Sequence, residues 1–349
     1  APCVQLQRDH EAAAKTFSTM KEGSMAKIYI CRNFFPDVLE RLKSVHDLKV
    51  WTGHAETPHD VLLHEMKDVE GLVPVGNRIS RDVFEAAPKL RVVSNMGDGC
   101  DHIDLQEATR RGIPVGHTPN VLSETTADLA MGLLIAAARR IVEGQAFARD
   151  GRWTAHAHLD LPGVDVNNKT LGIVGLGHIG SHVAKRARAF NMRVLYHNRN
   201  RAANLETLLG VEFRAKLHDL LAESDFVVLT LPLNDRTRNL IGRNEFAVMK
   251  PTAILVNVAR GPIVDDQALY EALKEHRILR AAIDVTSTEP LPLDSPLFSL
   301  DNIVLMPHIG SAVPETRKKM WTLAIEQLMI GLDGGRIPNC INPGVYDPA

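Results

Sequence analysis

The sequence predicts an α/β protein built on two doubly wound parallel sheets. From Met25 onward, short β-rich runs alternate with helix-length segments, which is the pattern of βαβ units. A long helical segment separates a first series of expected strands from a second one. The strands of the second series are almost continuously apolar, as strands buried on both faces of a parallel sheet are.

The expected elements follow one another along the chain in two groups. The first group contains the strands "KIYI", "LKVW", "GLVPV" and "LRVVSN", and a helix is predicted over 123–149. A last helix is predicted over 314–331, packed back on the first group. We therefore expect one domain from residues 25–119 plus 308–349 and another from 120–307, with 1–24 as a leader or an added segment. The strands of the second group are "TLGIVG" (170–175), "MRVLYH" (192–197), "DFVVLTL" (225–231), "AILVNV" (253–258), "RAAIDV" (280–285) and "NIVLM" (302–306).

Composition limits the classes of protein to consider. The chain has 349 residues, of which 45% are hydrophobic and 23% charged, enough for two cores. Its net charge of −2 gives no strong field toward nucleic acid or an anionic membrane. The longest apolar run, residues 129–138, is far shorter than the roughly 20 residues of a membrane span. Four cysteines without CxxC spacing favour a reduced, cytoplasmic setting.

The segment "TLGIVGLGHIG" carries the first functional signal. Gly175, Gly177 and Gly180 have GxGxxG spacing between an apolar strand and a helix, the context of a dinucleotide site. The first glycine permits the turn, the second lets the backbone approach a pyrophosphate, and the third lets helix and strand pack closely. The free N–H groups of the helix N-terminus favour phosphate there. The sequence therefore predicts Rossmann-like domains, with 120–307 as the dinucleotide-binding domain.

The next strand, "RVLYHNRNR", indicates which dinucleotide is bound. In NAD enzymes of this fold, an acidic residue about 20 positions after the glycines binds the adenosine ribose. Here Asn198 lies 23 residues after Gly175, and Arg199 and Arg201 follow. An amide does not repel a 2′-phosphate, and guanidinium groups match phosphate geometry. We expect NADP(H) to be preferred, with NAD(H) also accepted.

Three later segments place one polar residue each beyond a buried strand. "LVNVARG" contains Arg260, "AIDVTSTEPLP" contains Glu289, and "LMPHIGSA" contains His308. Because ligands of open α/β sheets bind at the carboxyl ends of strands, the three form a candidate catalytic set. Arg260 suits a substrate carboxylate, His308 suits proton transfer to a carbonyl oxygen, and Glu289 would orient the imidazole and favour its charged form. This set predicts reduction of a 2-keto acid.

These motifs resemble the D-isomer specific 2-hydroxyacid dehydrogenase family, and within it the glyoxylate/hydroxypyruvate reductase branch. The resemblance runs from about Lys27 to Gly335 and implies two Rossmann-like domains with an active-site cleft between them, 25–119 plus 308–349 binding substrate. It implies a homodimer formed through the helical segment 123–149. It also implies substrate contacts from Val75, Gly76, Met96 and Gly97, and cofactor contacts from His178, Ile179, Pro232, Val258, Asp284 and Gly310.

The sequence leaves two alternatives open. A larger 2-keto acid, such as 2-ketogluconate or an aromatic one, would use the same reacting centre. His156 stands where hydroxypyruvate reductases often present a second tryptophan after Trp153, which leaves the outer end of the substrate undecided. A corepressor-like scaffold that senses dinucleotides is the other alternative, although the intact catalytic set counts against it. His156 and His158 are two positions apart in a polar loop, a spacing that is usually incidental, so no metal site is expected.

Overall fold

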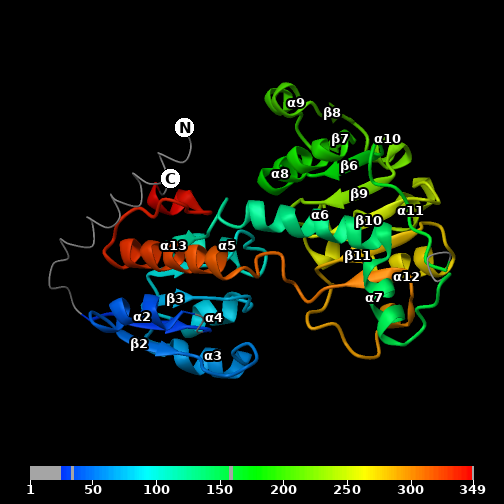
Figure 1. Ribbon diagram of the computed structural model, residues 1–349. Coiled ribbons are helices and arrows are strands. Elements are labelled where there is room, and N and C mark those ends of the chain that lie inside the picture. The colour runs from blue at the N-terminus through cyan, green and yellow to red at the C-terminus, as the bar shows by residue number, and fades with distance from the viewer. Residues whose placement is uncertain (1–24, 33–34, 157–159, 348–349) are drawn as a thin grey trace. The chain divides into compact units, whose positions relative to one another are not determined.

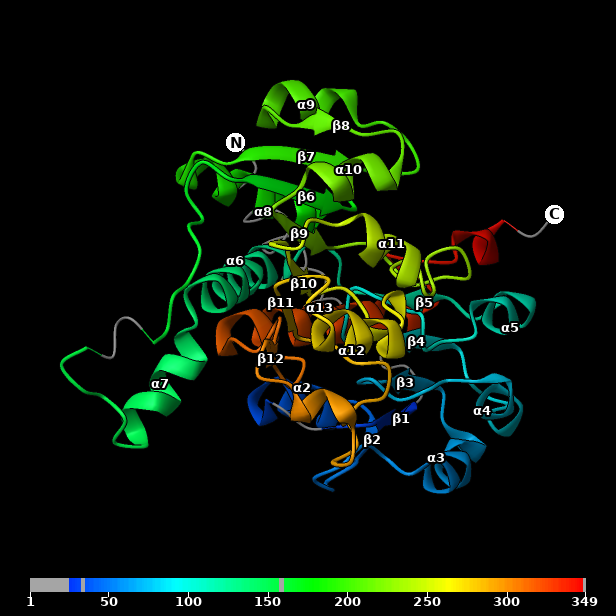
Figure 2. The same ribbon diagram turned by 90° about the vertical axis from the view of Figure 1, so that its right-hand side faces the viewer.

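The chain folds into two α/β units, each with its own parallel sheet (Figures 1 and 2). The structure is a computed structural model and describes residues 25–32, 35–156 and 160–347. The segment 1–24 and His158 lie outside the described residues. Within the described part, the first unit runs to Val121 and resumes at Arg317, and the second is Leu122–Thr316. Two parallel sheets confirm the predicted fold class.

The first unit has a five-stranded sheet in the order β2-β1-β3-β4-β5. All neighbouring strands are parallel, and the order changes direction between β1 and β3, where ligands of such sheets bind. One face of the sheet packs on α3 and α4 around Leu72 and Phe84. The strands are β1 (Lys27–Ile30), β2 (Asp47–Val50), β3 (Gly71–Val73), β4 (Val92–Ser94) and β5 (Val115–Gly116), and the helices are α2 (Pro36–Lys43), α3 (His59–Glu65), α4 (Arg81–Ala86) and α5 (Leu105–Arg110).

The opposite face of this sheet is covered by α13 (Pro314–Leu332), drawn in orange-red in Figure 1. The hydroxyl of Ser94 in β4 donates to the carbonyl of Ala324 in α13 at 2.6 Å. A Cβ atom at Gly71 would lie 3.1 Å from Leu328, so the helix lies directly on the strand. The predicted helix is therefore present and packs on the first unit as expected.

The second unit has a seven-stranded parallel sheet in the order β12-β11-β10-β9-β6-β7-β8. The order changes direction between β6 and β9, as in the Rossmann arrangement. The strands are β6 (Thr170–Val174), β7 (Arg193–His197), β8 (Glu212–Phe213), β9 (Phe226–Leu229), β10 (Ile254–Asn257), β11 (Arg280–Ile283) and β12 (Ile303–Leu305), and the helices are α6 (Ser123–Arg139), α7 (Ile141–Arg149), α8 (His178–Ala187), α9 (Ala203–Leu209), α10 (Leu217–Glu223), α11 (Arg243–Val248) and α12 (Asp266–Lys274).

Alternation along these strands produces two cores. Ile173 and Val228 point to the face covered by α6 and α8, whereas Val227 and Leu255 point to the face covered by α10, α11 and α12. Because both faces are covered, the strands can be apolar at nearly every position. The two edge strands β5 and β8, of two residues each, were not predicted, since so short a segment carries no periodic signal.

The helix predicted over 123–149 is wrong as one element. It is divided at Arg140, which has a left-handed backbone with φ of +54°. The N–H of Val164 donates to the carbonyl of Ala138 at 2.9 Å, so the returning chain takes a hydrogen-bond acceptor of the last turn of α6. The hydrogen-bond donor at the end of α6 is therefore Val164, a residue distant from the helix in sequence.

The second compact unit extends beyond the boundary expected at residue 308, because it includes 308–316. The backbone N–H of His308 donates to the carbonyl of Asp284 at 2.8 Å. Thr126 of α6 donates to the carbonyl of Gly310 at 3.1 Å. These bonds attach the segment after β12 to the second unit, and the chain leaves this unit within α13.

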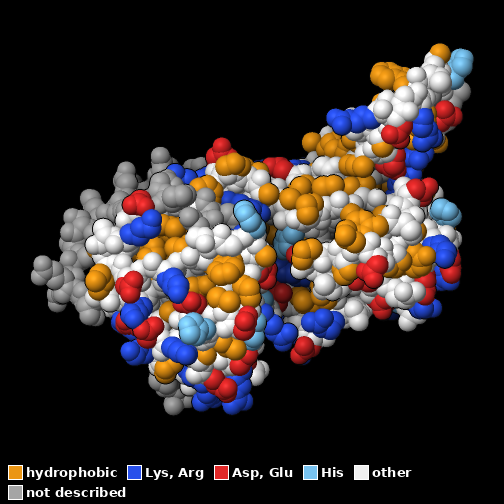
Figure 3. Space-filling model, turned by 90° about the horizontal axis from the view of Figure 1, so that it is seen from below, with side chains coloured by type: hydrophobic (Ala, Val, Ile, Leu, Met, Phe, Trp, Pro, Cys, Tyr) orange, Lys and Arg blue, Asp and Glu red, His pale blue; other side chains and the backbone are white. Residues whose placement is uncertain are grey.

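No helix among the described residues is long and apolar enough to cross a membrane. On the face drawn in Figure 3, Lys and Arg side chains are interspersed with Asp and Glu over the surface, in keeping with the small net charge.

Candidate active site

The three glycines after β6 have distinct surroundings. Gly175 has a φ of +101°, and a Cβ there would lie 2.8 Å from Leu231. A Cβ at Gly180 would lie 2.4 Å from the carbonyl oxygen of Gly175, so α8 and the strand are too close for any side chain. At Gly177, by contrast, a Cβ would meet nothing within 4 Å. This open backbone, at the reversal of strand order, fits the approach of a pyrophosphate.

Helix α8 begins directly at this loop with His178 and Ile179. The hydroxyl of Ser181 donates to the carbonyl of Gly177 at 2.7 Å, closing the first turn. The first N–H groups of a helix have no intrahelical acceptor, and the helix dipole adds partial positive charge. The residues present therefore fit a dinucleotide diphosphate, and the predicted contacts of the His178 and Ile179 backbone nitrogens with it stay predictions.

The three polar residues of the loop after β7 have different surroundings, which the sequence does not show. Asn198 accepts from the N–H of Leu176 at 2.6 Å and donates to its carbonyl at 3.4 Å, so it braces the glycine loop. Arg199 is exposed. Arg201 is paired with Glu206, Nε to Oε1, at 2.8 Å. The predicted contacts of these three residues to the adenosine ribose stay predictions.

The catalytic set lies at the carboxyl ends of three neighbouring strands. Arg260 follows β10, Glu289 follows β11, and His308 follows β12, and these strands are adjacent in the sheet. His308 Nδ1 and Glu289 Oε2 are 2.6 Å apart, so the pair proposed from sequence is formed. Both side chains are partly exposed, at 48% for His308 and 39% for Glu289, which leaves the imidazole accessible to a ligand.

The environment of Glu289 keeps its carboxylate ionised. Partial desolvation acts to raise its pKa, but the hydrogen bond and charge of His308 outweigh this effect, and the pKa is lowered. The N–H of Thr286 donates to Oε1 at 3.1 Å, and the charge of Arg260 acts in the same direction. The carboxylate therefore remains an acceptor for the imidazole Nδ1–H, which directs Nε2 away from Glu289.

The backbone of His308 is left-handed, with φ of +53°, an uncommon conformation for residues other than glycine. The buried carboxylate of Asp284 holds the turn, because Oδ1 accepts from Ile309 at 2.7 Å and Oδ2 from Gly310 at 2.8 Å. Burial raises the pKa of Asp284, against the effect of these two N–H groups and of His308. The contact of Asp284 with the nicotinamide and that of Gly310 with the cofactor stay predictions.

Arg260 is positioned by a turn that depends on Asn257, the last residue of β10. Asn257 is buried, accepts from the N–H of Ala259 at 3.0 Å and donates to the carbonyl of Arg260 at 3.0 Å. Gly261 then packs against the next loop, since a Cβ there would lie 1.9 Å from the carbonyl carbon of Thr286. The Arg260 turn and the Glu289 loop are thereby packed backbone to backbone.

Sequence reasoning missed Asn257 and Thr126, which shape the turns at Arg260 and Gly310. Asn257 had a local signal, because an amide ends an otherwise apolar strand in "AILVNV". Thr126 had none, since its partner lies 184 residues away. Of the other cofactor residues expected in this unit, Val258 is buried beyond β10, and Pro232 is exposed beyond β9.

The expected substrate residues of the first unit also come together. The N–H of Met96 donates to the carbonyl of Pro74 at 3.4 Å, joining the loops after the adjacent strands β4 and β3. Val75 is partly exposed, and Gly76 is exposed with φ of +86°, while Gly97 accepts from Thr118 at 2.9 Å. Their contact with substrate, and a cleft between the units, stay predictions.

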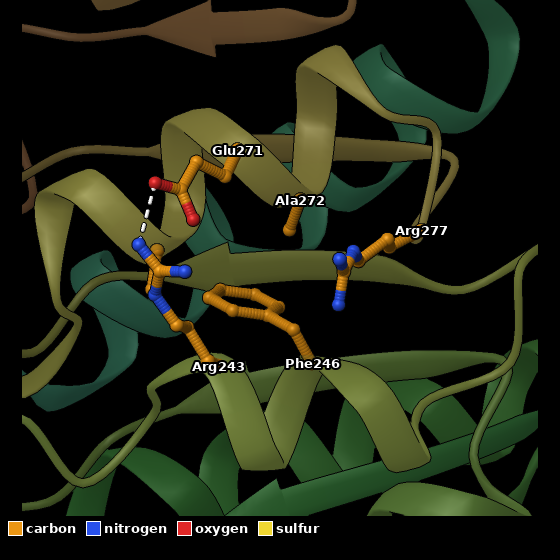
Figure 4. A pocket seen from close by; sticks show the side chains of 6 residues that line it. Arg243, Phe246, Glu271, Ala272 and Arg277 are labelled. Carbon is orange, nitrogen blue, oxygen red and sulfur yellow. Dashed lines mark hydrogen bonds and ion pairs between the residues drawn. The ribbon is translucent and has the colours of Figure 1, made fainter.

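A small pocket lies between α11 and α12, and none of the predicted site residues lines it (Figure 4). Arg243 and Arg277 approach the ring of Phe246, and Arg243 is paired with Glu271 at 2.6 Å. Among the described residues, no group of three or more His, Cys, Asp or Glu side chains is placed to hold a metal ion. The catalytic set therefore remains the candidate site.

Comparison with known proteins agrees with this geometry. Residues 131–310 match the model of the D-isomer specific 2-hydroxyacid dehydrogenase NAD binding domain. Glyoxylate reductase of Thermococcus kodakarensis is 47% identical over 324 residues, covering 91% of this chain and 97% of that protein. Glyoxylate reductase of Pyrococcus horikoshii is 47% identical over 318 residues, covering 89% and 94%.

Solved structures extend the likeness to three dimensions. The TT0316 protein of Thermus thermophilus has a TM-score of 0.83 at 44% identity, covering 90% of this chain and 99% of that one. The NADPH-dependent glyoxylate/hydroxypyruvate reductase of Sinorhizobium meliloti, solved with NADP and malonate, has a TM-score of 0.82 at 30% identity, covering 92% and 98%. The chain thus belongs to the D-isomer specific 2-hydroxyacid dehydrogenase family, within the branch of these glyoxylate reductases, and is an NAD(P)-dependent dehydrogenase acting on CH–OH groups.

Proposed function

We propose that this enzyme reduces small 2-keto acids, glyoxylate and hydroxypyruvate, to glycolate and D-glycerate, and that it prefers NADPH. The observation that carries the proposal is the 2.6 Å pair of His308 and Glu289 beside Arg260 at the ends of three neighbouring strands. The relatives named as glyoxylate reductases support the substrate, and the Sinorhizobium meliloti enzyme supports the cofactor.

The residues of the chain divide the work of the reaction. When bound, the nicotinamide cofactor supplies the hydride. Arg260 holds the carboxylate of the keto acid and polarises its carbonyl. The imidazolium of His308 gives its Nε2 proton to the carbonyl oxygen, while Glu289 keeps the ring oriented and stabilises its charge. Val75, Gly76, Met96 and Gly97 are proposed to bind the substrate carboxylate side from the first unit.

A substrate panel tests the reaction. Loss of NADPH absorbance is followed with glyoxylate, hydroxypyruvate, 2-ketogluconate and an aromatic 2-keto acid. We expect the highest kcat/KM for the two small acids. A higher value for a larger acid would contradict the proposed substrate class, and dinucleotide binding without turnover of any acid would favour the scaffold alternative.

Replacing Arg199 tests the cofactor preference. Its guanidinium is exposed at the end of β7, where a 2′-phosphate is expected. Since a hydrogen bond between charged groups contributes about 1.5–3 kcal/mol, Arg199→Ala is expected to lower kcat/KM for NADPH by about 10- to 100-fold and to leave that for NADH nearly unchanged. Arg193→Ala is the matched control, because Arg193 begins the same strand and is paired with Glu212 and Glu223. A wild-type preference for NADH would contradict the proposal.

The pH dependence of reduction tests the Glu289–His308 pair. Reduction takes up a proton at the carbonyl oxygen, so its rate is expected to fall as pH rises. Because the pKa of Glu289 is lowered, the pair persists at low pH until the pH falls through that lowered value. Glu289→Gln removes the carboxylate that accepts from His308 Nδ1, so the pH dependence of the rate should change. An unchanged profile in this variant would show that the pair has no part in proton transfer.

We further propose a cytoplasmic homodimer that forms through α6 and α7. Ile141 and Val142 of α7 are exposed at 53% and 46%, an apolar surface that a second copy would cover. Sedimentation velocity checks this proposal, and a monomer at micromolar concentration would contradict it. No nucleic-acid or membrane partner is proposed.

A further inference from the structure

The loop after β7 presents two arginines in different states. For Arg199, neither a hydrogen bond nor an ion pair is found within residues 25–32, 35–156 and 160–347. Arg201 forms a two-pronged ion pair with Glu206 of α9, in which Nε donates to Oε1 and Nη2 to Oε2, both at 2.8 Å. The planar fork of a guanidinium is well matched to a carboxylate in this geometry. The guanidinium of Arg199 is thus available to a ligand, whereas that of Arg201 is paired with Glu206.

Glu206 is held in place by more than Arg201. The hydroxyl of Tyr196 donates to Oε1 at 2.6 Å, and the same hydroxyl accepts from the N–H of Ala202 at 2.9 Å. Hydrogen bonds from Arg201 and Tyr196 lower the pKa of Glu206 to about 2, so the carboxylate is ionised at every working pH. Its side chain is 18% exposed, against 62% for Arg201. The anchored acid therefore holds the exposed guanidinium, and not the reverse.

We propose that Glu206 is a specificity-determining residue that limits the preference for NADPH by withholding Arg201 from the 2′-phosphate. The inference rests on the proposed function of this loop as the site of the adenosine ribose. A 2′-phosphate carries between one and two negative charges near neutral pH. The 2′-phosphate can bind Arg199 directly. It can bind Arg201 only in competition with the carboxylate of Glu206, which is held in place by Tyr196.

The effect is electrostatic and acts on a ligand that carries a 2′-phosphate. Glu206 places a negative charge beside Arg201, which opposes a second anion in the same region. Glu206→Gln removes this charge and keeps an oxygen that can accept from Tyr196. The variant should therefore free the guanidinium of Arg201 without altering the backbone bond from Ala202 to Tyr196.

Calorimetric binding of 2′,5′-ADP and 5′-AMP to the full chain tests the proposal apart from the chemical step. Glu206→Gln is expected to tighten 2′,5′-ADP by about tenfold, with 5′-AMP almost unchanged, because one charged hydrogen-bond partner becomes available. Glu206→Ala should shift the ratio of the two dissociation constants in the same direction. In the double variant Glu206→Gln, Arg201→Ala, the gain should disappear.

Glu212→Gln is the matched control. Glu212 lies in β8, pairs with Arg193 of the neighbouring strand β7 and with Arg214, and does not pair with Arg201. An unchanged or lower selectivity for 2′,5′-ADP in both Glu206 variants, or a gain that persists in the double variant, would overturn the proposal. The change on substitution is independent of the wild-type preference, so an NADH preference in the wild type would defeat the proposed cofactor and leave this test intact.

Discussion

His308→Ala is expected to lower kcat for glyoxylate reduction by about 10²–10⁴-fold, the usual contribution of a positioned general acid. The imidazole is half exposed, and its Nδ1 is hydrogen-bonded to Glu289. Arg260 follows β10, which is separated from β12 in the sheet by β11 alone. Without the ring, the developing oxyanion receives no proton from the protein. Rates of NADPH oxidation at saturating glyoxylate measure the loss, and NADPH binding by fluorescence should be retained.

A control is needed because His308 has a left-handed backbone. His276 has the same φ of +53° and is exposed in the turn after α12. His276→Ala therefore imposes the same kind of strain and should keep kcat close to that of the wild type. His308→Asn is a second variant, since Asn adopts this conformation readily and cannot act as the acid. Retained activity in His308→Asn would exclude His308 as the proton donor.

Gly261→Ala is expected to destabilise the second unit by about 1–3 kcal/mol or more, the cost of overpacking a site that cannot yield. A Cβ at this position would lie 1.9 Å from the carbonyl carbon of Thr286 and 2.3 Å from the nitrogen of Ser287. Both atoms belong to backbone, so two loops must separate. Since Thr286 also binds Glu289 at 3.1 Å, kcat should fall together with the free energy of unfolding.

Gly132→Ala is the matched control for this substitution. Gly132 lies within α6, and a Cβ there would meet nothing within 4 Å. Alanine in a helix interior is favoured over glycine by about 0.5–1 kcal/mol, so this variant should be slightly more stable than the wild type. Urea unfolding of the three proteins gives the comparison. Equal stability of Gly261→Ala and the wild type would refute the close packing of the two loops.

The sequence by itself determined the main elements and the candidate residues. Strands such as "TLGIVG" and "AILVNV" are apolar over consecutive positions, and this local property reflects burial on both faces. The glycine loop, Arg260, Glu289 and His308 were found because each follows such a strand, and parallel strands bring their carboxyl ends to one edge. These inferences need only local pattern and the geometry of a sheet.

The tertiary structure decided how those residues are held. The break at Arg140 depends on a bond from Val164 to Ala138, and the left-handed turn at His308 depends on the buried carboxylate of Asp284. Arg201, which appeared equivalent to its neighbour in the sequence, is paired with an acid that Tyr196 anchors. Partners of this kind are chosen by packing between segments far apart or folded over one another, and the free energy of each pair depends on surroundings that no local pattern contains.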